Sequence, residues 1–197
     1  RFIFRVVGIM NKGLDCARPN KTMKTYIVLL RGINVSGKNK LPMKELREML
    51  EKLNFTNVST YIQSGNIILQ SEATKEEVSK NIHEAIQSEF GYDIPVIIRT
   101  PNEWKKAIEN YPFSKENEKI VAFSFLNNSV QEKEIEVKGI NDDQYKIDSD
   151  IVYLYCPSGF GKTKLTNNTL EKKLNVVATT RNLKTTLKLW ELLKEIN

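Results

Sequence analysis

The 197-residue sequence predicts an α+β protein whose two related halves pack as one unit. Two observations lead to this prediction. Between residues 23 and 100, short apolar runs typical of strands alternate with segments whose apolar residues recur at helical spacing. Between residues 101 and 197 a similar succession of segments follows, with no disordered linker before it. No residue-level repeat relates the halves, so the prediction rests on element order alone.

The first half contains six predicted elements. In chain order they are strand 26–30, helix 43–53, strand 57–62, strand 66–70, helix 75–90 and strand 95–99. Pro42 suits the first turn of a helix, and Thr74 with Glu77 forms a capping box at the start of the next one. Gly91 is a natural helix stop. The order β-α-β-β-α-β is the ferredoxin-like arrangement.

The second half is predicted to follow the same theme more loosely. Its elements are a helix from Pro101, strand 120–126, a short helix over 130–138, a hairpin of strands 144–147 and 151–155, and helices 165–174 and 182–196. Thr100 and Glu103 form a second capping box with Pro101 at the first helical position. We therefore expect two subdomains, 23–100 and 101–197.

The net charge of +6 is concentrated at the N-terminus. Residues 1–22 hold five basic side chains and one acidic one, whereas the rest holds 25 basic and 23 acidic. This segment lacks periodicity, so we expect an extension outside the fold, with Met23 as the natural start. No apolar run is long enough to span a membrane. Two cysteines and one histidine exclude a disulfide framework and the usual zinc clusters, and a reducing cytoplasm fits best.

Two loops combine glycines with a lysine at a strand-to-helix junction. The loop 31–40 has the Gly-x4-Gly-Lys spacing of a phosphate-binding loop, but Asn39 stands where a magnesium-binding Ser or Thr belongs. The loop 157–163 has the Lys-Thr pair, but Cys156 replaces the first glycine. Neither predicts magnesium-dependent nucleotide hydrolysis. Two alternatives stay open for these loops: an anion site that uses Arg31, Asn34, Lys38 and Lys162, or plain turns whose polar residues bond their own backbone.

Two further polar clusters are candidate binding sites. Gln63, Ser64 and Asn66 could read a base edge or a substrate amide, although these types are also ordinary turn residues. Thr180, Arg181 and Asn182 stand where the last helix is expected to begin. A cation at that end opposes the helix dipole, so Arg181 marks either an anionic partner or a small uncorrected cost.

No acyl-transfer chemistry is predicted, because Ser64 has no plausible base. His83 lies in the middle of a predicted helix and is expected at the surface or its boundary.

The sequence resembles a bacterial family of unknown function, family 1697 of that class. The resemblance rests on four separated stretches in order, Leu29–Asn39, Thr60–Asn66, Gly159–Thr166 and Ala178–Asn182, and covers Met23 to the C-terminus. It implies a cytoplasmic protein with a ferredoxin-like N-terminal part, and it implies no activity.

The functional expectation is a binding protein for a phosphate-bearing partner, either RNA or a nucleotide. The alternatives are an enzyme acting on a small phosphorylated metabolite and a protein-interaction module without a ligand. The basic residues Arg31, Lys38, Lys162 and Arg181 are expected to converge on one anion-binding surface. The sequence predicts no catalytic residue, no metal and no cofactor, and it does not predict an oligomeric state.

Overall fold

The computed structural model describes residues 22–35, 37–115 and 117–196. Its elements are β1 (Lys24–Leu30), α1 (Met43–Lys52), β2 (Thr56–Tyr61), β3 (Asn66–Ser71), α2 (Lys75–Phe90), β4 (Val96–Arg99), α3 (Pro101–Glu109), β5 (Val121–Leu126), β6 (Gln144–Asp148), β7 (Ile151–Tyr155), α4 (Asn167–Leu174), β8 (Ala178–Asn182) and α5 (Leu183–Ile196). The mixed α+β class is confirmed. The expectation that residues 1–22 form an extension concerns a segment that, apart from Thr22, lies outside the described residues.

Two four-stranded antiparallel sheets form the framework. The strand order is β2-β3-β1-β4 in the first sheet and β6-β7-β5-β8 in the second. In each sheet the first strand of the chain is therefore central, and the last is an edge strand. The second sheet lacks a helix between its first two strands, because β5 is followed by a long connection over 127–143.

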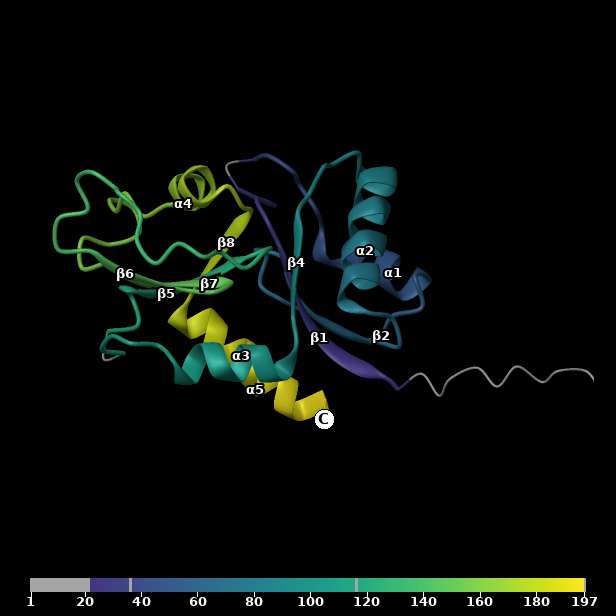
Figure 1. The fold of residues 1–197 in the computed structure, drawn as a ribbon. Coiled ribbons are helices and arrows are strands. Elements are labelled where there is room, and N and C mark those ends of the chain that lie inside the picture. Colours follow the sequence, from purple (N-terminus) through teal and green to yellow (C-terminus); the bar gives the residue numbers. More distant parts are fainter. Residues whose placement is uncertain (1–21, 36, 116, 197) are drawn as a thin grey trace, which may run out of the picture.

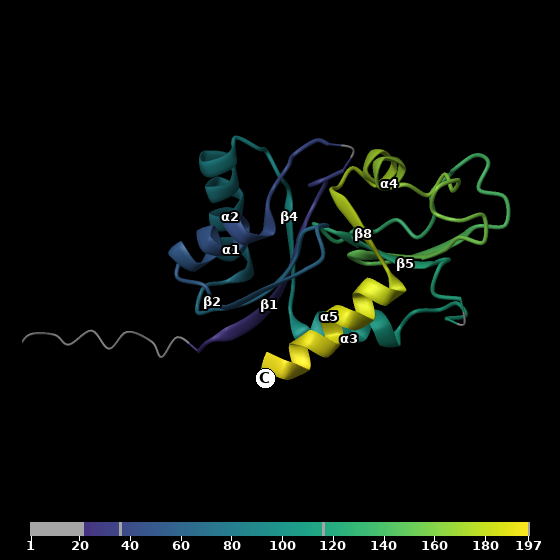
Figure 2. The ribbon, with the colours of Figure 1, turned by 180° about the vertical axis from the view of Figure 1, so that it is seen from behind.

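The helices cover the sheets on separate sides (Figure 1). Helices α1 and α2 lie on the outer face of the first sheet, and α4 lies on the second sheet. Figure 2 shows α3 and α5 side by side, where they contact strands of both sheets. The helix starts follow the sequence signals, since Thr74 and Thr100 both form complete capping boxes.

Three apolar clusters fill the spaces between these layers. One joins the first sheet to α1 and α2, and another joins the second sheet to α4. The third lies between the sheets and contains Ile27 and Leu29 of β1 together with Phe123 and Phe125 of β5. Trp104 of α3 belongs to this shared core and stacks on Phe125, with ring centroids 4.5 Å apart.

One element prediction is wrong, and one strand was not predicted. Residues 130–138 form no helix; instead, the Tyr145 hydroxyl bonds both the N–H and the carbonyl oxygen of Ile135 and holds this charged stretch as a loop. Residues 178–182 form the strand β8, and α5 begins at Leu183. Arg181 is therefore a strand residue, so the helix-dipole argument for it does not hold.

Candidate functional site

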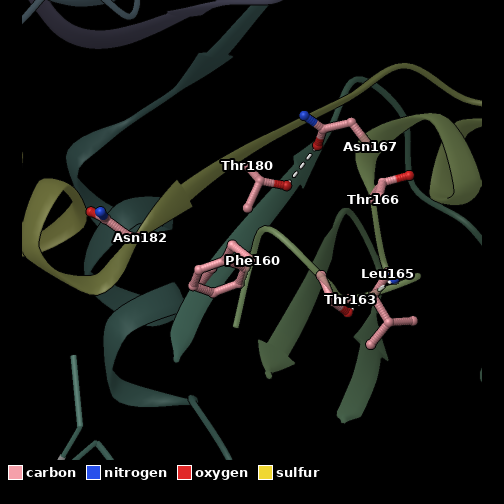
Figure 3. A pocket seen from close by; sticks show the side chains of 8 residues that line it. Phe160, Thr163, Leu165, Thr166, Asn167, Thr180 and Asn182 are labelled. Carbon is pink, nitrogen blue, oxygen red and sulfur yellow. Dashed lines mark hydrogen bonds between the residues drawn. The ribbon is translucent and has the colours of Figure 1, made fainter. Parts of the chain in front are cut away.

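A pocket of about 370 Å³ opens on the second sheet, beside the start of α4 (Figure 3). Its lining combines neutral polar side chains with one aromatic ring and two aliphatic residues. The lining residues are Ala122, Phe160, Thr163, Leu165, Thr166, Asn167, Thr180 and Asn182. None of these side chains carries a formal charge. The pocket is thus suited to an uncharged polar group rather than to a bare phosphate.

Strand β8 supplies one wall because side chains alternate along a strand. Thr180 and Asn182 face the pocket, whereas Thr179 and Arg181 face the first half of the protein. The Thr180 hydroxyl donates to Oδ1 of Asn167 over 2.6 Å, which ties β8 to the first turn of α4. The predicted Thr180–Asn182 cluster is therefore divided between two faces.

The second glycine-lysine loop supplies the opposite wall, and a buried carboxylate shapes it. Asp143, 4% exposed, accepts hydrogen bonds from the backbone N–H of Ser158 (3.0 Å) and from its hydroxyl (2.6 Å). Burial raises the pKa of this carboxyl, but the bonds from Ser158 and Thr163 outweigh that effect and lower it overall. The loop amides of Lys162 and Thr163 donate to the Gly159 carbonyl. They are used within the turn, so this loop does not cradle phosphate with those amides.

Some side chains of this loop and next to it are exposed and could contact a ligand. The Lys162 side chain is exposed, as is that of Lys164 beyond it. Phe160 is 37% exposed and forms part of the pocket lining. Cys156, next to the loop, is a buried free thiol whose pKa burial raises to about 11, so it is not a reactive nucleophile.

The first glycine-lysine loop is held by its own asparagines. Asn34 gives its side-chain N–H groups to the carbonyls of Leu41 (3.0 Å) and Gln63 (2.9 Å), and its Oδ1 accepts from the Leu41 N–H. Asn39 donates to the Gly32 carbonyl. Lys38 is exposed at the tip. This pattern matches the alternative in which the loop's polar residues bond backbone, and the loop does not line the pocket.

Arg31 connects the first loop to α4 rather than standing free. Its guanidinium donates to both carboxylate oxygens of Glu171 (3.0 and 3.2 Å) and to Oδ1 of Asn168 (2.8 Å). Glu171 also accepts the N–H of Ala178 at the start of β8. This ion pair therefore fixes the position of α4 against both halves.

Arg181 is buried, at 7% exposure. Its guanidinium donates to Oδ1 of Asn66, to the Thr179 hydroxyl and to the backbone carbonyls of Leu30, Ser64, Gly65 and Thr180. Burial, with a further contribution from nearby Arg31, lowers its pKa to about 10. All its N–H groups serve the fold, so the predicted convergence of four cations on one open surface is not observed.

The β2–β3 turn lies on the Arg181 side of β8. Asn66 is fully buried and donates to the Tyr61 carbonyl and the Ser64 hydroxyl, while Gln63 is exposed. The amide of Asn66 is thus a structural element of the turn. Gln63 keeps a side chain directed to solvent next to the first loop.

The sequence reading missed Phe160, Thr163 and Asn167. Phe160 carried a usable signal, because a large aromatic between two glycines of a loop has little to pack on. Thr163 was noted only as part of the Lys-Thr pair, and Asn167 carried no signal, since its role depends on how β8 approaches α4. Within the described ranges, no group of three or more His, Cys, Asp or Glu side chains is placed to hold a metal ion.

A family model described as Protein of unknown function (DUF1697) matches residues 23–153. The chain belongs to this family. The match includes the first loop and the β2–β3 turn, and it ends before the second loop. Comparison with curated proteins gives no match.

Among solved structures, the chain is similar to a conserved bacterial protein from Streptococcus pneumoniae. The TM-score is 0.64 at 24% sequence identity, over 87% of this chain and 99% of that one. The likeness concerns the fold. No helix in the part of the chain that the structure describes is long and apolar enough to cross a membrane.

Proposed function

We propose that the protein binds a phosphate-bearing partner, RNA or a nucleotide, and that the base enters the pocket beside Phe160. The observation that carries this proposal is the pocket lining: hydroxyl and amide side chains surround one aromatic ring, with no charged group among them. Base edges present hydrogen-bond donors and acceptors, and base faces stack on aromatic rings. The pocket lining offers both features, because its Thr and Asn side chains can bond a base edge and the Phe160 ring can stack on a base face.

The phosphate would lie outside the pocket. Lys162 is exposed on the loop that carries Phe160, and Lys164 is exposed just beyond it, so a base on that ring would bring its phosphate toward these two lysines. Lysines on flexible stems suit such a contact, because they act as point charges that need no fixed geometry. The site supports binding and not magnesium-dependent hydrolysis, since the loop amides of Lys162 and Thr163 are already used.

The metabolite-enzyme alternative has less support, because it needs Arg31 and Arg181 as free grips for an anion. Arg31 is paired with Glu171, and Arg181 is enclosed by carbonyls. We therefore favour the binding role.

We further propose that both halves have the ferredoxin-like arrangement, with subdomains at 23–100 and 101–197. The support is the shared strand order, in which the second half replaces its first crossover helix with a loop. We propose a cytoplasmic location, which agrees with the buried free thiol of Cys156.

The test is titration of the full chain with a single-stranded RNA octamer and with free nucleoside monophosphates. Phe160→Ala should weaken binding at least fivefold, since base stacking contributes about 1–3 kcal/mol. Val35→Ala, which truncates another exposed apolar side chain, serves as the matched control. Tighter binding of the octamer than of the monophosphates, with a steep fall of the octamer's affinity as salt rises, identifies RNA as the partner. Absence of binding by both probes, or binding that ignores Phe160→Ala, would refute the proposal.

A further inference from the structure

Ser124 is a buried hydroxyl without a hydrogen-bond partner. It lies on β5, the central strand of the second sheet, and is fully buried. Among the residues that the structure describes, its Oγ is the one buried side-chain oxygen or nitrogen that no other group bonds. Buried polar groups are nearly always bonded, so an exception asks for an explanation.

The alternation along β5 shows which face Ser124 is on. Phe123 and Phe125 belong to the core shared by the two sheets, whereas Ala122 and Leu126 belong to the cluster under α4. Ser124 lies on the same face as Ala122, which lines the pocket. Ser124 itself does not line the pocket, so it lies buried on the pocket side of the sheet, next to the lining residues, rather than in the shared core.

The residue directly opposite Ser124 in the sheet is Thr180. Directly opposed side chains in an antiparallel pair have Cβ atoms about 4.5–5.5 Å apart, close enough for two hydroxyls to bond. The Thr180 hydroxyl instead donates to Oδ1 of Asn167 over 2.6 Å. The hydroxyl opposite Ser124 is therefore directed to Asn167, and Ser124 has no hydrogen bond to it.

We propose that Ser124, buried next to the pocket lining, senses a ligand through an exchange of hydrogen bonds with Thr180. A ligand N–H, such as one on a base edge, donates to Oδ1 of Asn167 and displaces the Thr180 hydroxyl. That hydroxyl then turns to Ser124, which gains the partner it lacks. The ligand class is thus a neutral ring with an N–H donor at its edge. This inference rests on the proposed function of the same pocket.

The exchange predicts opposite effects of one substitution on stability and on binding. Ser124→Ala removes a hydroxyl that is unsatisfied in the free protein, so the midpoint of urea unfolding should stay or rise. The same change removes the partner that Thr180 gains with ligand, so affinity for the nucleoside monophosphates should fall at least threefold. If Ser124 served only packing, its substitution would not weaken ligand binding while leaving the unfolding midpoint unchanged or higher.

The experiment measures urea unfolding and nucleoside monophosphate titration for the wild type, Ser124→Ala, Thr180→Val and the double variant. Because both side chains serve one exchange, the double variant should bind no more weakly than Thr180→Val alone. The exposed Ser129→Ala serves as control and should change neither readout.

Each outcome decides between the two proposals. Wild-type affinity in Ser124→Ala, with binding still sensitive to Phe160→Ala, overturns the exchange and leaves the proposed function standing. A lowered unfolding midpoint in Ser124→Ala overturns it as well, because the hydroxyl then has a partner in the free protein. If the wild type binds none of the monophosphates and no RNA octamer, the proposed function fails and the exchange fails with it.

Discussion

At the scale of single residues, Arg181 shows how one buried cation can be held without a carboxylate. In the described chain, no Asp or Glu lies within ion-pair distance of its guanidinium, and the positive charge is stabilised by an asparagine oxygen, a hydroxyl and four carbonyls. Those carbonyls come from the end of β1, the β2–β3 turn and β8. The side chain therefore links strands of both sheets.

Arg181→Ala should lower the free energy of unfolding by about 3–5 kcal/mol, because it leaves several buried acceptors without donors. Urea unfolding at pH 7 measures this change. Lys184→Ala, at an exposed position three residues later, should stay within about 0.5 kcal/mol of the wild type. A small effect of Arg181→Ala would instead return Arg181 to the list of candidate ligand-binding cations.

Asp143 stabilises the second loop in a way that depends on pH. Its pKa is lowered in the folded protein, so its contribution is present above the ordinary carboxyl pKa of 3.8 and is lost as the pH falls through the folded value. Asp143→Asn should cost about 1–3 kcal/mol at pH 7, and the difference from the wild type should shrink at pH 3. Urea unfolding at the two pH values checks this. An equal difference at both would mean that the charge of Asp143 is not what matters.

At the scale of elements, the β2–β3 turn contains two residues with positive φ, Ile62 and Gly65, whose substitution should change the free energy of unfolding in opposite directions. Ile62 is β-branched yet has a φ of 49°, and half of its side chain is exposed. Gly65 has a φ of 73°, and an added Cβ would lie 2.6 Å from Cβ of Leu30. Position 65 thus requires glycine, whereas at position 62 a glycine would relieve the backbone strain of the β-branched isoleucine.

Ile62→Gly should raise the free energy of unfolding by about 1 kcal/mol, because it removes a left-handed conformation from a β-branched residue. Gly65→Ala should lower it by about 2 kcal/mol or more, because the backbone is strained and the added methyl group meets Leu30. Thermal melts of the two variants give the comparison. Destabilisation by Ile62→Gly would show that the aliphatic side chain contributes more than its exposure suggests.

The elements also show where sequence reasoning succeeds. The capping boxes at Thr74 and Thr100 are local signals and are confirmed, because a cap depends on four consecutive residues. Strand β8 was missed, because Ala178–Asn182 is polar and becomes a strand by pairing with β5. The charged and ambiguous 130–138 stretch was wrongly predicted as a short helix; it is a loop, and its apolar residues Val130, Ile135 and Val137 pack on the cluster under α4.

The candidate site was predictable only in part for the same reason. The second loop and Thr180 could be named from the sequence, but the pairing of β8 with β5 decides which side chains face the pocket. Arg181 and Asn66 were named for their chemistry, and tertiary packing turned that chemistry inward. Ser124 carries no sequence signal at all, because its missing partner is visible only in the fold.

At the scale of the whole molecule, the two sheets share one apolar core and several polar contacts. Ile27 and Leu29 face Phe123 and Phe125 across that core, and the indole N–H of Trp104 donates to the Thr186 carbonyl of α5. The two halves are also joined by polar contacts, from Arg31 to Glu171 of α4 and from Arg181 of β8 to the β2–β3 turn. Neither sheet buries its inner face without the other.

The whole chain should therefore unfold in one cooperative step. Urea transitions followed by far-ultraviolet circular dichroism and by tryptophan fluorescence should coincide, because Trp104 and Trp190 both lie in or against the shared core.

A fragment of residues 23–100 should fail to fold natively by itself, since Ile27, Leu29 and Ile97 would face water across a whole sheet. Mixing it with a 101–197 fragment should restore protection of these strands in hydrogen exchange. Two separate transitions, or a well-folded 23–100 fragment, would mean that the halves are independent domains and that the Arg181 contacts join them without making them one cooperative unit.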